Sequence, residues 1–177
     1  MLKELLQPEL PWRMLLSQFM TQQAQDDYSY QRPSRREGDA IFPSLRSSQV
    51  NVVIAVDTSG SVKQSQIDEF LAEINVIKSQ LRAKITLLAS DEELVEGAPW
   101  IYEAWEELLL PIDIKGGRGT SFEPAFEYVN NQDMKPDVFV YFTDGKGKFP
   151  QIEPEYPVIW LIKGKKQPPW GRRVQLN

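Results

Sequence analysis

Five oxygen-bearing side chains in three short polar segments are the residues of this sequence best suited to chemistry. They are Asp57, Ser59, Ser61, Thr120 and Asp144. The first three lie in the stretch VVIAVDTSGSV, where an apolar run ends at a carboxylate and two hydroxyls follow at alternate positions. Hard oxygen donors with only two negative charges suit a divalent cation that keeps part of its water. We therefore expect a Mg²⁺ site, with Mn²⁺ or Ca²⁺ as alternative ions.

The overall composition narrows the chemistry further. The 177 residues include no histidine and no cysteine, which excludes a Ser-His-Asp triad, thiol chemistry, disulfides and His/Cys zinc sites. The formal net charge is −5 and no long basic run occurs, so nucleic acid and anionic membranes are disfavoured as partners. The N-terminal stretch carries charges and two prolines, unlike a signal peptide or a membrane span, and we expect a cytoplasmic protein.

The secondary structure that carries these side chains is predicted to alternate between strands and helices. Apolar runs predict four strands, at residues 50–56, 84–90, 136–143 and 156–162, and RRVQL suits a final edge strand. Apolar residues at helical spacing predict two helices, one from Ile67 to Leu81 and one from Phe122 to Val129. This alternation implies a mostly parallel α/β sheet of Rossmann-like type, covered by helices on both faces.

Two regions have a less regular pattern. Between the second strand and the second helix, we expect a short edge strand near Leu94–Glu96, a helical turn in WIYEAWEELL and a strand near Leu109–Ile114. Residues 1–49 contain apolar side chains at helical spacing, followed by a polar stretch. We expect them to form a helix and an extended arm that pack on the main domain, residues 50–177.

The three polar segments fall where ligands bind in open α/β sheets, at the carboxyl ends of strands. If the strands are parallel neighbours, the segments converge on one point. Taken singly, Asp57 or Ser61 could instead cap the following helix. The glycines of GGRGTS could form a phosphate cradle, but no Walker lysine follows and their spacing matches no nucleotide-binding fingerprint.

Together, these side chains resemble the metal-ion-dependent adhesion site of von Willebrand factor A domains. The motif reads Asp57-x-Ser59-x-Ser61, then Thr120, then Asp144, within about residues 50–177. The resemblance implies that Ser59 and Ser61 bind the metal directly, whereas the two aspartates and Thr120 bind directly or through water. It also implies that a Glu or Asp of a protein partner completes the metal's coordination.

A closer resemblance includes the N-terminal arm. The stretches DDYSYQRPSRR, PSLRS and FTDGKGKFP resemble the C-terminal A-type domain of bacterial proteins described as metallopeptidases. In that family the two-histidine peptidase motif lies in a separate N-terminal region, so this chain is expected to be a non-catalytic C-terminal part of a larger protein. The resemblance further implies association with MoxR-type AAA+ ATPases, and a supporting, non-ligand role for Asp91.

The expected function is therefore a Mg²⁺-dependent protein–protein interaction module and not an enzyme. The alternative is a metal-dependent hydrolase that uses the same site. A hydrolase would need a base, and no side chain of the motif offers an obvious one near neutral pH.

Overall fold

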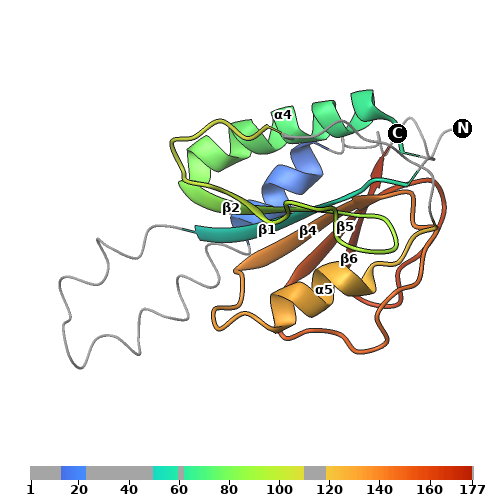
Figure 1. Cartoon of the computed structure of the whole chain (residues 1–177). Coiled ribbons are helices and arrows are strands. Elements are labelled where there is room, and N and C mark those ends of the chain that lie inside the picture. The colour runs from blue at the N-terminus through green and yellow to red at the C-terminus, as the bar shows by residue number, and fades with distance from the viewer. Residues whose placement is uncertain (1–12, 23–49, 60–61, 110–118, 177) are drawn as a thin grey trace, which may run out of the picture.

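The computed structural model describes residues 13–22, 50–59, 62–109 and 119–176, which form one six-stranded sheet with helices on both faces (Figure 1). The strands are β1 (Val50–Asp57), β2 (Ala83–Ser90), β3 (Trp100–Tyr102), β4 (Val138–Thr143), β5 (Val158–Lys163) and β6 (Arg172–Leu176). Their order is β3-β2-β1-β4-β5-β6, and every neighbouring pair is parallel except β2–β3. The predicted mostly parallel α/β sheet is confirmed.

Central strand β1 explains the continuous apolar run in the sequence. Helix α4 (Gln64–Leu81) and the helix at residues 13–22 cover one face of the sheet, and α5 (Glu123–Asn130) covers the other (Figure 1). Val52 and Ile54 pack in the core on the α4 side, while Val53 and Ala55 pack on the α5 side. Both faces of β1 are therefore buried, so its residues do not alternate between apolar and polar.

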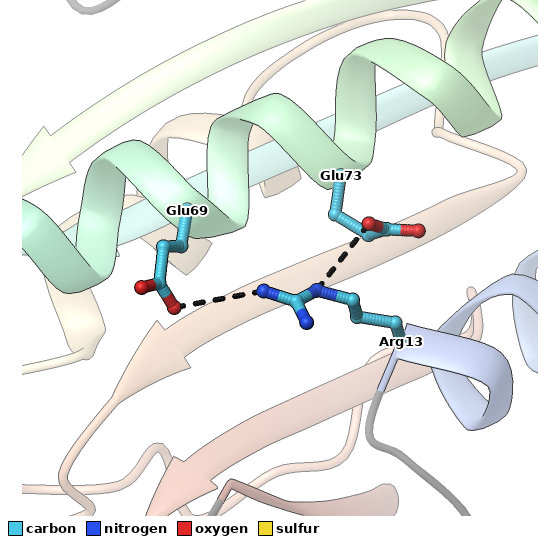
Figure 2. A network of polar contacts seen from close by, with 3 residues as sticks. All are labelled: Arg13, Glu69 and Glu73. Atoms are coloured by element: carbon cyan, nitrogen blue, oxygen red, sulfur yellow. Dashed lines mark ion pairs between the residues drawn. The ribbon is translucent and has the colours of Figure 1, made fainter.

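The helix at residues 13–22 belongs to the core on the α4 side. Leu16 and Met20 are both 0% exposed there. Arg13 forms solvent-accessible ion pairs with Glu69 at 3.7 Å and with the partly buried Glu73 at 3.5 Å on α4 (Figure 2). Solvent-accessible pairs of this kind add little free energy, so apolar burial holds the helix in place. Residues 1–12 and 23–49 lie outside the described residues, and the division of the chain near residue 49 stays a prediction.

The predictions for the segment after β2 are wrong in two places. Leu94 forms only an isolated antiparallel bridge with Ser90, and the edge strand is Trp100–Tyr102, inside the stretch predicted as a helical turn. The two aromatic side chains pack against the core, whereas Ile101 between them is 54% exposed. This alternation of buried and exposed side chains is typical of a strand. The segment forms a strand because the edge of β2 is available for pairing. Leu109 lies in a loop, and 110–114 fall outside the described residues.

Polar side chains of α4 anchor the loop that follows β3. The amide of Asn75 donates to Leu108 O at 2.9 Å, and Leu108 N donates to Asn75 Oδ1 at 2.7 Å. The ammonium of Lys78 donates to Ala104 O at 2.7 Å and to Glu106 O. Lys78 is only 2% exposed, and this burial lowers its pKa, although the nearby glutamates oppose the shift. The carbonyl groups thus replace the water that a buried lysine loses.

Replacing Asn75 with alanine is expected to lower the free energy of unfolding by about 1–3 kcal/mol, because the buried Leu108 backbone loses both its donor and its acceptor. Urea denaturation measures this change. The matched control is Gln80→Ala on the exposed side of α4, which should change stability by less than about 0.5 kcal/mol. Equal effects of the two substitutions would contradict the anchoring role of Asn75.

Candidate metal centre

The carboxylate of Asp57 is held by hydrogen bonds to both of its oxygens. Thr143 Oγ1, at the end of neighbouring strand β4, donates to Asp57 Oδ2 at 2.6 Å. The backbone N–H of Ser59 donates to Asp57 Oδ1 at 2.8 Å. Asp57 is 0% exposed and Ser59 is 5% exposed. The carboxylate is therefore fixed in orientation at the carboxyl edge of the sheet.

A second carboxylate, Asp144, lies close enough to affect the first. Burial raises the pKa of Asp57, and the charge of Asp144 raises it further, while hydrogen bonds from Thr143 and Ser59 act in the opposite direction. Asp144 is 6% exposed, and its Oδ1 accepts the backbone N–H of Lys146 at 2.9 Å. Two buried carboxylates in one place repel each other. A divalent cation would offset this repulsion, so the donor set fits such an ion.

The segment that carries Thr120 is tied to the ends of two strands. Lys148 N donates to Thr120 O at 3.3 Å, which joins the segment to the loop after β4. Ser121 N donates to Asp91 O at 2.9 Å, which joins it to the turn after β2. Thr58 N in turn donates to Ser90 O at the end of β2, at 3.0 Å. These contacts bring the three polar segments to one edge of the sheet.

The structure describes four of the five predicted site residues. Asp57, Ser59 and Asp144 lie together at the sheet edge, and the Thr120 segment reaches the same edge. Ser61 lies outside the described residues, as do the glycines at 116 and 117. The alternative that Asp57 caps the following helix is wrong, because α4 begins at Gln64 and its N-cap residue is Lys63. Asp57 instead accepts a hydrogen bond from the backbone N–H of Ser59. Whether these side chains bind a metal stays a prediction.

The donors available at this edge are oxygen atoms, and the identity of a bound metal stays a prediction. Within the described ranges, no group of three or more Asp, Glu, His or Cys side chains is placed to hold a metal ion. A cation at this edge would therefore need hydroxyl oxygens in addition to Asp57 and Asp144. The sequence pattern indicated no separate role for Thr143, although the Thr143 hydroxyl orients Asp57. The position of Thr143 just before Asp144 was the available signal.

Replacing Gly147 with alanine is expected to disturb the centre without changing its charge. An added Cβ would lie 2.7 Å from Thr120 Cγ2 and 2.8 Å from Phe122 Cζ, and Phe122 is 0% exposed. Because the Phe122 ring cannot move into solvent, the free energy of unfolding should fall by about 1–3 kcal/mol. Mg²⁺ affinity should fall as the Thr120 segment shifts. Urea denaturation and calorimetry measure the two effects.

The matched control for that variant is Gly119→Ala, next to Thr120. An added Cβ there would lie 2.6 Å from Glu92 Oε1, the end of a flexible side chain that can move away. This substitution should therefore change stability by less than about 0.5 kcal/mol. If both glycine variants behave alike, the close contact between Gly147 and Thr120 has no importance for the centre.

Comparison with known protein families identifies the family of this chain. It belongs to the family described as "VWA-like domain (DUF2201)", whose model matches residues 52–177. Residues 1–46 match a second model, described as "Putative metallopeptidase domain". The predicted membership of the von Willebrand factor A-like class, next to a metallopeptidase-family region, is thereby confirmed. Neither match shows a bound metal, a partner or a catalytic activity.

Individual relatives add context. An uncharacterized protein of Thermotoga maritima is 28% identical over 146 residues, which cover 81% of this chain and 35% of that protein. The chain therefore spans about a third of the length of that relative. Among solved structures, the ArnB paralog VWA2 from Sulfolobus acidocaldarius has a TM-score of 0.47 and 17% identity, covering 66% of this chain and 35% of that one.

A second solved structure is an aerotolerance-related membrane protein from Bacteroides fragilis. Its TM-score is 0.42 at 19% identity, and the match covers 64% of this chain and 67% of that one. Likenesses at this level carry no inference about function. In the part of this chain that the structure describes, no helix is both long and apolar enough to cross a membrane.

Proposed function

We propose that this chain is a Mg²⁺-dependent protein–protein interaction module that recognises a carboxylate of its partner. The observation that carries the proposal is the convergence of Asp57 and Asp144, both almost fully buried, beside Ser59 at the carboxyl edge of the sheet. The proposed metal-binding side chains are these three with Ser61 and Thr120, where Asp57, Asp144 and Thr120 would bind the ion directly or through water. Bound there, Mg²⁺ would supply a positive centre with affinity for one more anionic oxygen.

The limited negative charge of the site supports recognition of an outside acid. Two carboxylates only balance a divalent ion, and the remaining proposed ligands, Ser59, Ser61 and Thr120, are neutral hydroxyls. A carboxylate of the partner would therefore gain a charge-assisted contact in a largely dry setting. Thr143 and the Ser59 backbone would serve by holding Asp57 still, so that little reorganisation accompanies binding.

The partner we propose is a MoxR-type AAA+ ATPase in the cytoplasm, with this chain acting as part of a longer protein. The arm motifs that resemble the A-type domains of metallopeptidase-family proteins support this context. The match of residues 1–46 to a metallopeptidase-family model supports it as well.

A metal-dependent hydrolase is the second candidate, and that same metallopeptidase-family match is what favours it. The chain has no histidine, and Asp57 is enclosed with both oxygens accepting hydrogen bonds. Neither feature suits a base that must reach an attacking water. The binding module is therefore the better proposal.

Capture of a purified MoxR-type ATPase by the immobilised chain is expected to require Mg²⁺. A chelator should lower capture about tenfold or more, because loss of a charge-assisted contact is worth at least about 1.4 kcal/mol. Added Mg²⁺ should restore capture, and Asp144→Ala should abolish it. Capture that ignores both chelator and substitution would refute metal-mediated recognition. Metal-dependent cleavage of peptide substrates by the same preparation would favour the hydrolase.

A further inference from the structure

Exposed lysines lie on one side of the candidate metal centre. Lys146 follows Asp144 by two residues, and Lys165 and Lys166 lie in the loop after β5. We name these three side chains the lysine ledge. A Cβ added at Gly145 would lie 2.7 Å from Lys166 Cβ, so Lys166 packs directly beside the residue that follows Asp144. The ledge is therefore adjacent to one of the two carboxylates of the centre.

The backbone beneath the ledge is held in place. Arg173 of β6 donates from Nε to Lys166 O at 2.8 Å and from its guanidinium to Gly164 O. These bonds tie the loop after β5 to the edge of the sheet. On the other side, the backbone N–H of Lys146 donates to Asp144 itself. The positive charges thus project from a backbone with defined anchors next to the centre.

These three lysines form no ion pair within the described part of the protein. Neighbouring Lys148, by contrast, pairs with Glu123 at 3.7 Å. On the β2 side of the centre the charge is opposite, because Glu92 lies against Gly119. Among the described residues, lysines therefore lie on the β4–β5 side of the centre and Glu92 lies on the β2 side.

We infer that the partner segment is acidic beyond its single metal-binding carboxylate, with further Asp or Glu residues lying over the lysine ledge. This inference rests on the proposed function and specifies the class of ligand. Complementary charge across an interface selects partners and fixes their orientation. Glu92 should repel acidic residues that extend toward the β2 side. The additional acidic residues should therefore lie on only one side of the metal-binding carboxylate in the partner's sequence.

The ledge has a second consequence, for metal affinity. Lysine charges beside Asp144 repel a cation, so the chain alone should bind Mg²⁺ weakly. An acidic segment that neutralises the ledge should strengthen metal binding, and metal should strengthen binding of the segment. Reversal of a ledge charge should therefore change two affinities in opposite directions, whereas damage to the fold would lower both.

The test uses fluorescence anisotropy of two labelled peptides with the full chain in Mg²⁺ or in chelator. One peptide carries a glutamate followed by a run of aspartates, and the other carries the same glutamate followed by serines. The acidic peptide should bind more tightly in Mg²⁺, by about two- to fivefold for each lysine it contacts. Lys166→Glu should remove that preference and also raise Mg²⁺ affinity in calorimetry.

The matched control is Lys84→Glu, the same change in charge at the opposite end of the sheet, which should alter neither quantity. Equal binding of the two peptides would overturn the ledge inference, as would an unchanged preference for the acidic peptide in both Lys146→Glu and Lys166→Glu. If peptide binding still required Mg²⁺ in those cases, the proposed function would stand. Failure of both peptides to bind would also overturn it. Peptide binding that is indifferent to chelator would instead refute the proposed function.

Discussion

Replacing Asp57 with asparagine is expected to weaken Mg²⁺ binding strongly while leaving the metal-free protein folded. The substitution keeps the shape of the side chain and removes one of two carboxylate charges from the centre. Loss of that ligand charge should weaken Mg²⁺ binding on the order of a hundredfold. Burial raises the pKa of Asp57 and so penalises its ionised form, and the neutral amide removes that cost. The amide also loses one of the two hydrogen bonds that the carboxylate accepts, so the two effects on stability oppose each other.

Thermal denaturation with and without Mg²⁺ measures both parts of this expectation. Ligand that binds only the folded state raises the melting temperature, so the unchanged chain should respond to Mg²⁺ and Asp57→Asn should not. Asp137→Asn is the matched control, since Asp137 accepts Asn51 N at 2.8 Å at the opposite end of the sheet. A full Mg²⁺ response in Asp57→Asn would show that Asp57 is not needed for metal binding. Outright unfolding of this variant would show that Asp57 has a structural role.

Replacing Trp160 with alanine is expected to cost about 3–5 kcal/mol of unfolding free energy, the largest loss of stability for a single change proposed here. Trp160 is 0% exposed on β5. Its ring centroid lies 4.9–5.6 Å from those of five others, Phe122, Phe126, Tyr141, Phe149 and Trp170. Removing it opens a cavity that these rings cannot fill by small movements.

The control for this substitution is Trp105→Ala. Trp105 is 81% exposed, so its removal creates no cavity and should change stability by less than about 0.5 kcal/mol. Urea denaturation compares the two variants. Similar midpoints for Trp160→Ala and Trp105→Ala would mean that the aromatic cluster on the α5 side does not hold the sheet together.

The strands near the centre of the sheet and the helix α4 could be predicted from sequence for a local reason. Buried strands flanked by covering layers show an unbroken apolar run, as in β1 and β4, and α4 shows its buried stripe at helical spacing. Asp57 and Asp144 end such runs, and in a parallel sheet those ends share one edge. Composition and topology therefore predicted where the candidate centre lies.

Tertiary contacts alone decided the rest. Trp100–Tyr102 forms a strand because β2 offers an open edge, and no local pattern shows that edge. Lys78 is buried, unlike most lysines, because its ammonium group donates hydrogen bonds to carbonyl groups of the loop after β3. Lys166 comes to lie beside Gly145 through the parallel pairing of β4 with β5. These placements depend on partners distant in sequence, and such partners are set by packing of the whole chain and not by local residue preference.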